Sequence, residues 1–245
     1  MRGRRAARLA AIALLATITA GCRLDASVGV SLEADGSGVF EVILAADPAL
    51  VAQAAAAGAD PLASLADAVR GLPGWEVATG ETDGGRRTAL RAEFSGPAGF
   101  ARLTDQFESA LGAPELDVLG PLRLEVIGDR LRVRGSAALI PTPQVSELGM
   151  SERQAVAALA ETVRYEVRVR MPGAVLDSNA DEQDGGELRW VVPAGRTVEF
   201  QADGERPRSP LPLLVAGGVL AALVTAWVLR RSPRPVPAPV ARDAL

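Results

Sequence analysis

Residues 163–171, Val-Arg-Tyr-Glu-Val-Arg-Val-Arg-Met, alternate apolar and charged side chains over nine positions. A period of two residues is typical of a β-strand that buries one face and exposes the other to water. Pro172-Gly173 then ends the strand, because proline has no N–H to donate and glycine tolerates a sharp change of direction. The stretch predicts a strand whose apolar face must be covered by other elements.

Helices are predicted on the N-terminal side of this strand. Ser151 and Gln154 have the spacing of a capping box, which predicts a helix over residues 151–160. Asp47-Pro48 and Asp60-Pro61 each combine an N-cap side chain with a proline suited to the first helical turn, and two short helices should follow them. A fourth helix is predicted from apolar residues at helical spacing: Phe100, Leu103, Phe107 and Leu111.

Three hairpins are predicted between these helices, over residues 28–44, 75–94 and 124–133. The third turns at Gly128-Asp129. Its register should place apolar pairs on one face and an ion pair between Glu125 and Arg132 on the other.

A polar loop over residues 177–186 should separate the strand at 163–171 from closing strands near 188–192 and 198–202. The resulting order of elements is ββααββαββαβββ. It predicts an α+β fold in which an antiparallel sheet, built from hairpins, carries helices packed on one face.

Composition excludes several kinds of active site. All 26 basic residues are arginine, histidine is absent, and there is a single cysteine. This composition therefore excludes a zinc cluster, a catalytic triad with histidine, a Schiff-base lysine and an internal disulfide. Residues 23–229 carry a net charge of −11, and the chain has nine aromatic residues, so a nucleic-acid partner is not expected.

The N-terminus predicts export. Four arginines precede a mostly apolar run at residues 9–20, which is too short to span a bilayer, so residues 1–21 form a predicted signal peptide. The end of this segment, Thr19-Ala20-Gly21-Cys22, resembles the lipobox of bacterial lipoproteins, with Thr19 where leucine is usual. That resemblance implies lipid attachment at Cys22. The alternative is an ordinary signal-peptidase boundary.

A second membrane signal lies near the C-terminus. Residues 211–229 contain no charged side chain, and as a helix they would be about 28 Å long, close to the hydrocarbon thickness of a bilayer. Arg230-Arg231 follow directly and belong on the cytoplasmic side. We therefore predict an extracytoplasmic domain at 22–209, a transmembrane helix at 210–230 and a short basic cytoplasmic tail at 231–245. A buried helix of a soluble protein is the alternative for this segment.

The stretch YEVRVRMPGAVLDSN at 165–179, followed by ELRWVVPAG and VEFQA, resembles the closing segment of the LppM family of actinobacterial envelope proteins. The lipobox, the opening hairpin and the C-terminal span agree with that family's layout. The resemblance implies an exported α+β lipoprotein domain associated with envelope glycolipids, and no enzymatic motif comes with it. The residues that carry it are Pro172, Gly173, Asn179, Trp190 and Gly195.

Each group of candidate binding residues can also be explained by a purely structural role. Arg164, Arg168 and Arg170 are candidate contacts for a phosphorylated lipid head group, or simply the wet face of a sheet. Trp75 and Trp190 could line a pocket or fill the core, and the core is favoured. Four carboxylates of the polar loop could bind calcium or form a solvated turn, and the turn is favoured: Asp177, Asp181, Glu182 and Asp184.

These observations favour a non-catalytic binding module for envelope lipid or glycolipid, with no cofactor and no metal. A structural or protein-interaction module that uses the acidic domain is the alternative. A hydrolase that uses a pair of carboxylates is the weakest of the three functional hypotheses. The sequence identifies no protein partner.

Overall fold

The computed structural model describes residues 22–58, 60–111, 119–141 and 150–207. The predicted signal peptide at 1–21, the predicted span at 210–230 and the predicted tail at 231–245 lie outside these residues. Within the described ranges, no helix has the length and apolar character needed to cross a bilayer.

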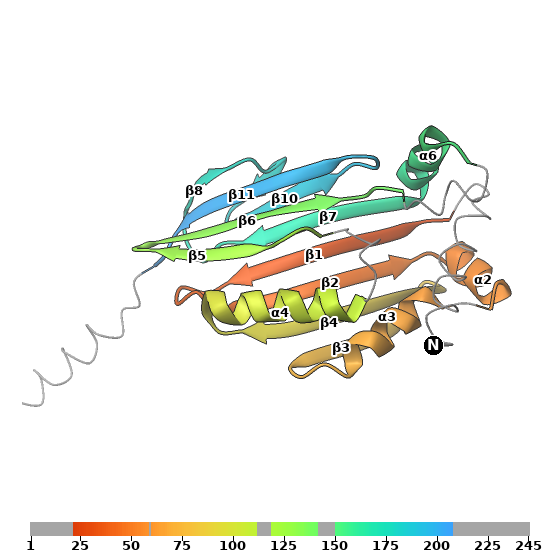
Figure 1. Ribbon diagram of the computed structural model, residues 1–245, viewed down its shortest axis with the longest axis horizontal. Helices are drawn as coiled ribbons and strands as arrows, with labels where there is room; N and C mark the ends of the chain where they lie inside the picture. Colours follow the sequence, from red (N-terminus) through yellow and green to blue (C-terminus); the bar gives the residue numbers. More distant parts are fainter. Residues whose placement is uncertain (1–21, 59, 112–118, 142–149, 208–245) are drawn as a thin grey trace, which may run out of the picture. The chain divides into compact units, whose positions relative to one another are not determined.

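The described part is a mixed α+β fold with two sheets and four helices (Figure 1). The larger sheet has seven strands, in the spatial order β3 (Trp75–Thr82), β4 (Gly85–Phe94), β2 (Gly38–Ala46), β1 (Leu24–Leu32), β7 (Val163–Arg170), β10 (Glu187–Val192) and β9 (Glu182–Asp184). The smaller sheet has four strands, in the order β5 (Arg123–Ile127), β6 (Arg130–Ala138), β11 (Thr197–Glu205) and β8 (Val175–Ser178). The helices are α2 (Pro48–Ala56), α3 (Pro61–Arg70), α4 (Gly96–Leu111) and α6 (Glu152–Thr162).

The expected single antiparallel sheet is only partly right. All three hairpins form in antiparallel register, but β1 and β7 are parallel neighbours at the centre of the larger sheet, with Val28 opposite Val167. The closing strands divide between the two sheets, since β10 pairs with β7 while β11 pairs with β6. These pairings join segments far apart in the chain, and local patterns do not specify them.

The four predicted helices form where their caps and periodicity place them. Asp47 and Asp60 accept hydrogen bonds from the backbone N–H groups of Leu50 and Ala63, which caps α2 and α3. The capping box of α6 is complete, with Ser151 and Gln154 bonding reciprocally. These signals are local, so they could be read from the sequence alone.

The inner face of the larger sheet is covered by two kinds of element. Helices α3 and α4 pack on the side of β3 and β4, whereas strand β11 of the smaller sheet contacts β10 (Figure 1). Phe40 meets Trp75 and Phe107 edge to face under α4, and Trp190 meets Phe200 between the sheets at 5.6 Å. One large core results, with a smaller apolar cluster of Ala46, Leu50 and Leu62 as a separate group.

The third hairpin confirms the predicted register but corrects its ion pair. Glu125 does stand opposite Arg132. The Arg132 guanidinium, however, donates to both carboxylate oxygens of Asp203 on β11, at 2.6 and 2.9 Å. These bonds hold the pKa of Asp203 below its ordinary value. A bidentate pair with a nearly buried carboxylate is a stronger interaction than an exposed cross-strand pair.

The segment expected as a polar loop at 177–186 is partly strand, because it contains the last two residues of β8 and the whole of β9. Two of its carboxylates have protein partners. Asp181 accepts a hydrogen bond from the backbone N–H of Val191 at 2.8 Å, and Glu182 pairs with Arg189 at 3.2 Å. These two side chains hold β9 and its flank against β10.

Candidate functional site

An apolar pocket of about 380 Å³ opens where the larger sheet meets α2 and the start of α3. Its floor is formed by Leu24 on β1 and by Leu44 and Ala46 on β2. The rest of the lining comes from α2, from the residues that follow it, and from α3 and β4: Leu50, Val51, Ala54, Ala55, Gly58, Asp60, Leu62 and Arg86. A cavity of this size and character is typical of a small-molecule site.

The alanine-rich sequence of α2 explains the space. Towards the sheet this helix presents Leu50 and the small side chain of Ala54, so the gap above Leu44 and Ala46 is not filled. Asp47 fixes the helix to the start of β1, because its second carboxylate oxygen accepts the backbone N–H of Arg23 at 2.7 Å. Because the helix is held in place and its side chains are small, the space between it and the sheet stays unfilled.

One ion pair marks the polar end of the pocket. Arg86 on β4 pairs with Asp60, the residue that also caps α3. The two side chains are about one-third exposed, at 35% and 41%. Among the described residues that line the pocket, they are the only charged groups, and the other side chains are apolar.

Cys22, the predicted lipid-attachment residue, lies beside the apolar pocket. It is half-buried and packs against the small cluster formed by Ala46, Leu50 and Leu62. Its thiol donates to Oε1 of Gln53 on α2 at 3.1 Å.

A second pocket of about 300 Å³ lies on the other side of α3 and is more polar. Arg86 belongs to both pockets. The remaining lining comes from α3 and from the paired ends of β3 and β4: Ala63, Ala66, Asp67, Arg70, Thr79, Gly80, Glu81 and Thr88. Thr88 is fully buried, and its hydroxyl has no hydrogen-bond partner among the described residues.

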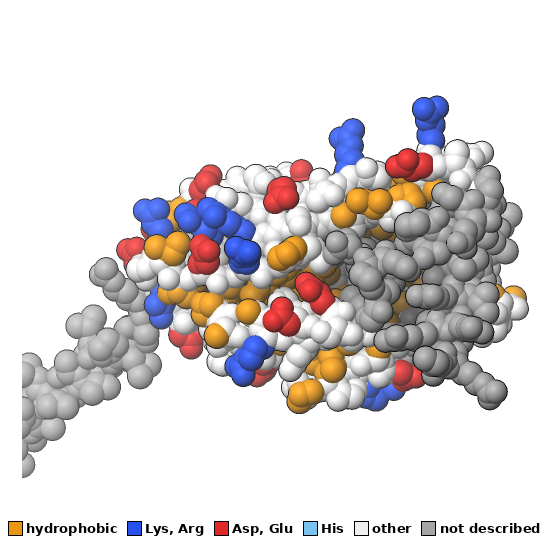
Figure 2. All heavy atoms as spheres, in the orientation of Figure 1, with side chains coloured by type: hydrophobic (Ala, Val, Ile, Leu, Met, Phe, Trp, Pro, Cys, Tyr) orange, Lys and Arg blue, Asp and Glu red, His pale blue; other side chains and the backbone are white. Residues whose placement is uncertain are grey.

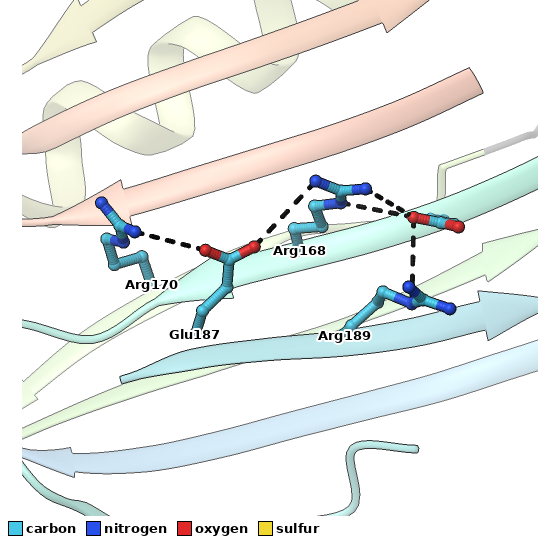
Figure 3. Close-up of polar contacts among 5 residues, drawn as sticks. Arg168, Arg170, Glu187 and Arg189 are labelled. Atoms are coloured by element: carbon cyan, nitrogen blue, oxygen red, sulfur yellow. Dashed lines mark hydrogen bonds and ion pairs between the residues drawn. The ribbon is translucent and has the colours of Figure 1, made fainter. Parts of the chain in front are cut away.

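The three arginines proposed for head-group contact lie elsewhere. Arg164, Arg168 and Arg170 point from β7 to the outer face of the larger sheet, whereas both pockets open on its inner face. Arg168 and Arg170 both pair with Glu187 on β10, at 4.0 and 3.3 Å (Figure 3). Arg168 also bonds the nearly buried Glu166 at 2.9 Å. Carboxylates therefore offset much of the positive charge of this row.

Another set of arginines was not singled out by the sequence patterns. Figure 2 shows basic side chains gathered over β5 and β6, next to apolar ones. Arg123, Arg130 and Arg134 of this hairpin are exposed, on the face that also carries the Arg132–Asp203 pair. Their alternation with Leu124, Leu131 and Val133 was the signal that could have identified them.

The signature residues hold strands together. Asn179 accepts the indole N–H of Trp190 at 3.0 Å and the backbone N–H of Gln201 at 2.8 Å, and donates to the carbonyl of Glu199 at 2.9 Å. Gly195 has a positive φ of 77°, and a Cβ at Gly173 would lie 2.5 Å from the carbonyl oxygen of Glu205. Pro172 precedes that close approach and is half-buried. This arrangement explains why an asparagine, a tryptophan and glycines are needed at these positions.

The pocket itself was not anticipated from the sequence. The run of alanines between Asp47-Pro48 and Asp60-Pro61 was the available signal, because a helix with small side chains cannot fill the space beside a sheet.

The family model described as the LppM domain matches residues 23–206. The NMR structure of the folded domain of LppM from Mycobacterium tuberculosis is similar at a TM-score of 0.47 and 17% identity, with 74% of this chain and 89% of that chain covered. No curated protein matches the sequence.

Proposed function

Because the chain belongs to the LppM family, we propose that it is a membrane-anchored envelope module that binds lipid without catalysing a reaction. The observation that carries this proposal is the apolar pocket between β1, β2 and α2. Its lining provides apolar contact for a hydrocarbon chain. A water molecule takes up about 30 Å³ in the liquid and a methylene group is of similar size, so the pocket would hold roughly a dozen methylenes.

The proposal places the domain at the outer surface of the cell membrane. The predicted signal peptide would export residues 22–209, with a lipid on Cys22 at one end and the predicted span at 210–230 after the other. Labelling with a clickable fatty acid tests the first attachment. Native protein should incorporate the label and the Cys22→Ala variant should not, whereas equal labelling of both would contradict lipidation at Cys22.

Photo-crosslinking tests lipid binding. Full-length protein in vesicles would be irradiated with an alkyl probe that carries a diazirine in its chain, and the modified peptides would be identified by mass spectrometry. We expect labelling of α2 and of the facing ends of β1 and β2.

The pocket offers a matched pair of variants for this experiment. Ala54→Phe fills the pocket, since Ala54 is buried in its wall, whereas Ala52→Phe adds the same ring on the exposed side of the same helix. Labelling should fall at least fivefold in the first variant and stay unchanged in the second. Equal labelling in both would refute the pocket as the lipid site.

A second candidate function is docking of a basic envelope protein. It is favoured by the net charge of −11 on residues 23–229. Binding that weakens steeply with salt and is unaffected by Ala54→Phe would favour this function over lipid binding.

A further inference from the structure

We propose that the second, more polar pocket beside α3, here called the polar pocket, binds the lysine side chain of a basic protein partner. The ammonium group of that lysine would bond to Glu81 and Thr88. This inference does not depend on lipid binding in the apolar pocket. It rests on the second candidate function, docking of a basic envelope protein, and gives that function a site and a recognised group.

The first argument is the unpaired hydroxyl of Thr88. This residue is fully buried in the lining of the polar pocket, and its hydroxyl has no hydrogen-bond partner among the described residues. Buried polar groups almost always have a partner, so one without a partner marks a place where a ligand or a water molecule is expected. A hydroxyl oxygen has two lone pairs and can accept an N–H bond from such a ligand.

The second argument is the unpaired carboxylate of Glu81. Both arginines of the lining already have carboxylate partners, because Arg70 pairs with Asp67 and Arg86 pairs with Asp60. Glu81 stands opposite Arg86 but forms no ion pair or hydrogen bond with the described residues. Among the described residues that line the pocket, the unpaired charge is therefore negative, which favours a cationic ligand.

The third argument is the spacing of these two groups. Thr88 lies opposite Thr79 in the antiparallel pair of β3 and β4, and Glu81 follows Thr79 by two residues. Thr88 and Glu81 are thus diagonal neighbours on the inner face of the sheet, with Cα atoms about 7–8 Å apart. One ammonium nitrogen can bond to both side chains because its three N–H groups diverge from a single atom, whereas the planar fork of a guanidinium matches the two oxygens of one carboxylate.

The rest of the lining is compatible with a lysine stem. Ala63 and Ala66 on α3 and Gly80 on β3 provide small, apolar surface along which methylene groups can pack. All 26 basic residues of the chain are arginine, so a lysine side chain must come from another protein. The net charge of −11 on residues 23–229 favours a basic one.

Carbodiimide coupling tests the contact between the ammonium group and Glu81 on full-length protein in detergent. The reagent joins a carboxylate to an amine that touches it, and the protein has no lysine that could compete. The probe is acetyl-Gly-Lys-Gly-amide, and coupled sites are identified by mass spectrometry. We expect coupling at Glu81 at least fivefold above coupling at Glu76, an exposed carboxylate on the outer face of the same strand. Equal coupling at the two positions would overturn the proposal.

Variants at Thr88 test the hydroxyl. Thr88→Val removes it at nearly constant volume and should lower coupling at Glu81 at least fivefold, while coupling at Glu76 stays the same. Thr88→Ser should restore the signal. Thr104→Val is the matched control, because Thr104 is also buried but lies outside both pockets and donates to the carbonyl of Ala101. Unchanged coupling at Glu81 in folded Thr88→Val protein would contradict the assigned contact.

Asp60→Asn tests the charge argument independently of Thr88. Asparagine can still cap α3, but it releases Arg86 to pair with Glu81, which stands opposite it. Coupling at Glu81 should fall severalfold, because the released guanidinium competes with the ammonium group. Unchanged or stronger coupling in this variant would count against the charge argument.

A competitor identifies the recognised group. An excess of acetyl-Gly-Arg-Gly-amide should change coupling at Glu81 by less than twofold. Loss of coupling would assign the pocket to a guanidinium, which a second copy of this chain could supply, and would overturn the assignment of lysine.

The outcomes separate this inference from lipid binding. Ala54→Phe, which fills the apolar pocket, should leave coupling at Glu81 unchanged. If lipid labelling of α2 fails while coupling at Glu81 occurs as expected, the proposed function fails and this inference stands. The reverse result overturns this inference alone.

Discussion

At the scale of single residues, the structure distinguishes buried polar groups that have partners from those that do not. Trp190 and Trp75 are both buried, at 1% and 8% exposure, but among the described residues only the indole N–H of Trp190 has an acceptor, Asn179. Thr88 resembles Trp75 in this respect. An unsatisfied group in the interior costs free energy, so these positions should respond differently to substitutions that remove the group.

The first prediction compares the two tryptophans. Trp190→Phe and Trp75→Phe remove similar volume, but only the former breaks a hydrogen bond. We expect Trp190→Phe to lower the free energy of unfolding by about 1 kcal/mol more than Trp75→Phe. Urea unfolding of both variants measures the difference, and a larger loss in Trp75→Phe would contradict the assigned hydrogen bonds.

The second prediction concerns Tyr165, the single tyrosine of the chain. Burial raises the pKa of its phenol well above the ordinary value. Because the folded-state pKa exceeds the unfolded one, this group favours the folded state fully below pH about 10 and progressively loses that contribution as the pH rises further.

Ultraviolet absorbance of the phenolate should therefore appear together with unfolding measured by circular dichroism. Tyr165→Phe should make unfolding less dependent on pH in this range. Phenolate formation in a fully folded protein near pH 10 would contradict the burial of this side chain.

At the scale of elements, the predictable parts are those whose signals are local. Asp47-Pro48, the Ser151 capping box and the Gly128-Asp129 turn each specify an element within a few residues, and all three form as expected. The expected Glu125–Arg132 ion pair was wrong because β11 brings Asp203 to Arg132 from across the sheet. The pocket was not predicted either, because the alanine run after Asp47-Pro48 indicates small side chains but does not specify which side chains face them.

The third prediction addresses α2, the helix that forms the wall of the apolar pocket. Asp47 caps this helix and also accepts the backbone N–H of Arg23, so Asp47→Ala removes two hydrogen bonds. We expect a loss of about 1–2 kcal/mol of stability. Faster amide hydrogen exchange in α2 and at the start of β1 should accompany it.

Asp67→Ala is the control for this prediction. Asp67 is an exposed carboxylate of α3 that pairs with Arg70 one turn later, and it caps no helix. This variant should change stability by less than about 0.5 kcal/mol. Equal losses in the two variants would show that Asp47 does not act as the cap.

At the scale of the whole molecule, long-range pairing decides the architecture. The parallel neighbours β1 and β7 are more than one hundred residues apart in the chain. No local sequence pattern indicates that the closing strands divide between two sheets. A run such as residues 163–170 predicts a strand but does not specify its neighbour. The α+β class could therefore be predicted from the sequence, whereas the two-sheet arrangement could not.

The fourth prediction concerns topology in the cell. Protease added to intact cells, after the outer envelope has been made permeable, should digest the domain and leave a small C-terminal fragment that contains the predicted span. A tag on the C-terminus makes this fragment visible. Full protection of the domain would contradict its extracytoplasmic placement.

The two ends of the described chain have a consequence for how such a protein would rest on a bilayer. Cys22 precedes β1, whereas Arg206 donates to the carbonyl of Ala34 just beyond the other end of that strand. The nine residues of β1 therefore separate the segment at Cys22 from the segment at Arg206 by about 30 Å. If a lipid on Cys22 and the predicted span at 210–230 both hold the domain, it would not stand upright on the membrane. It would lie along the membrane with its strands roughly parallel to the lipid surface.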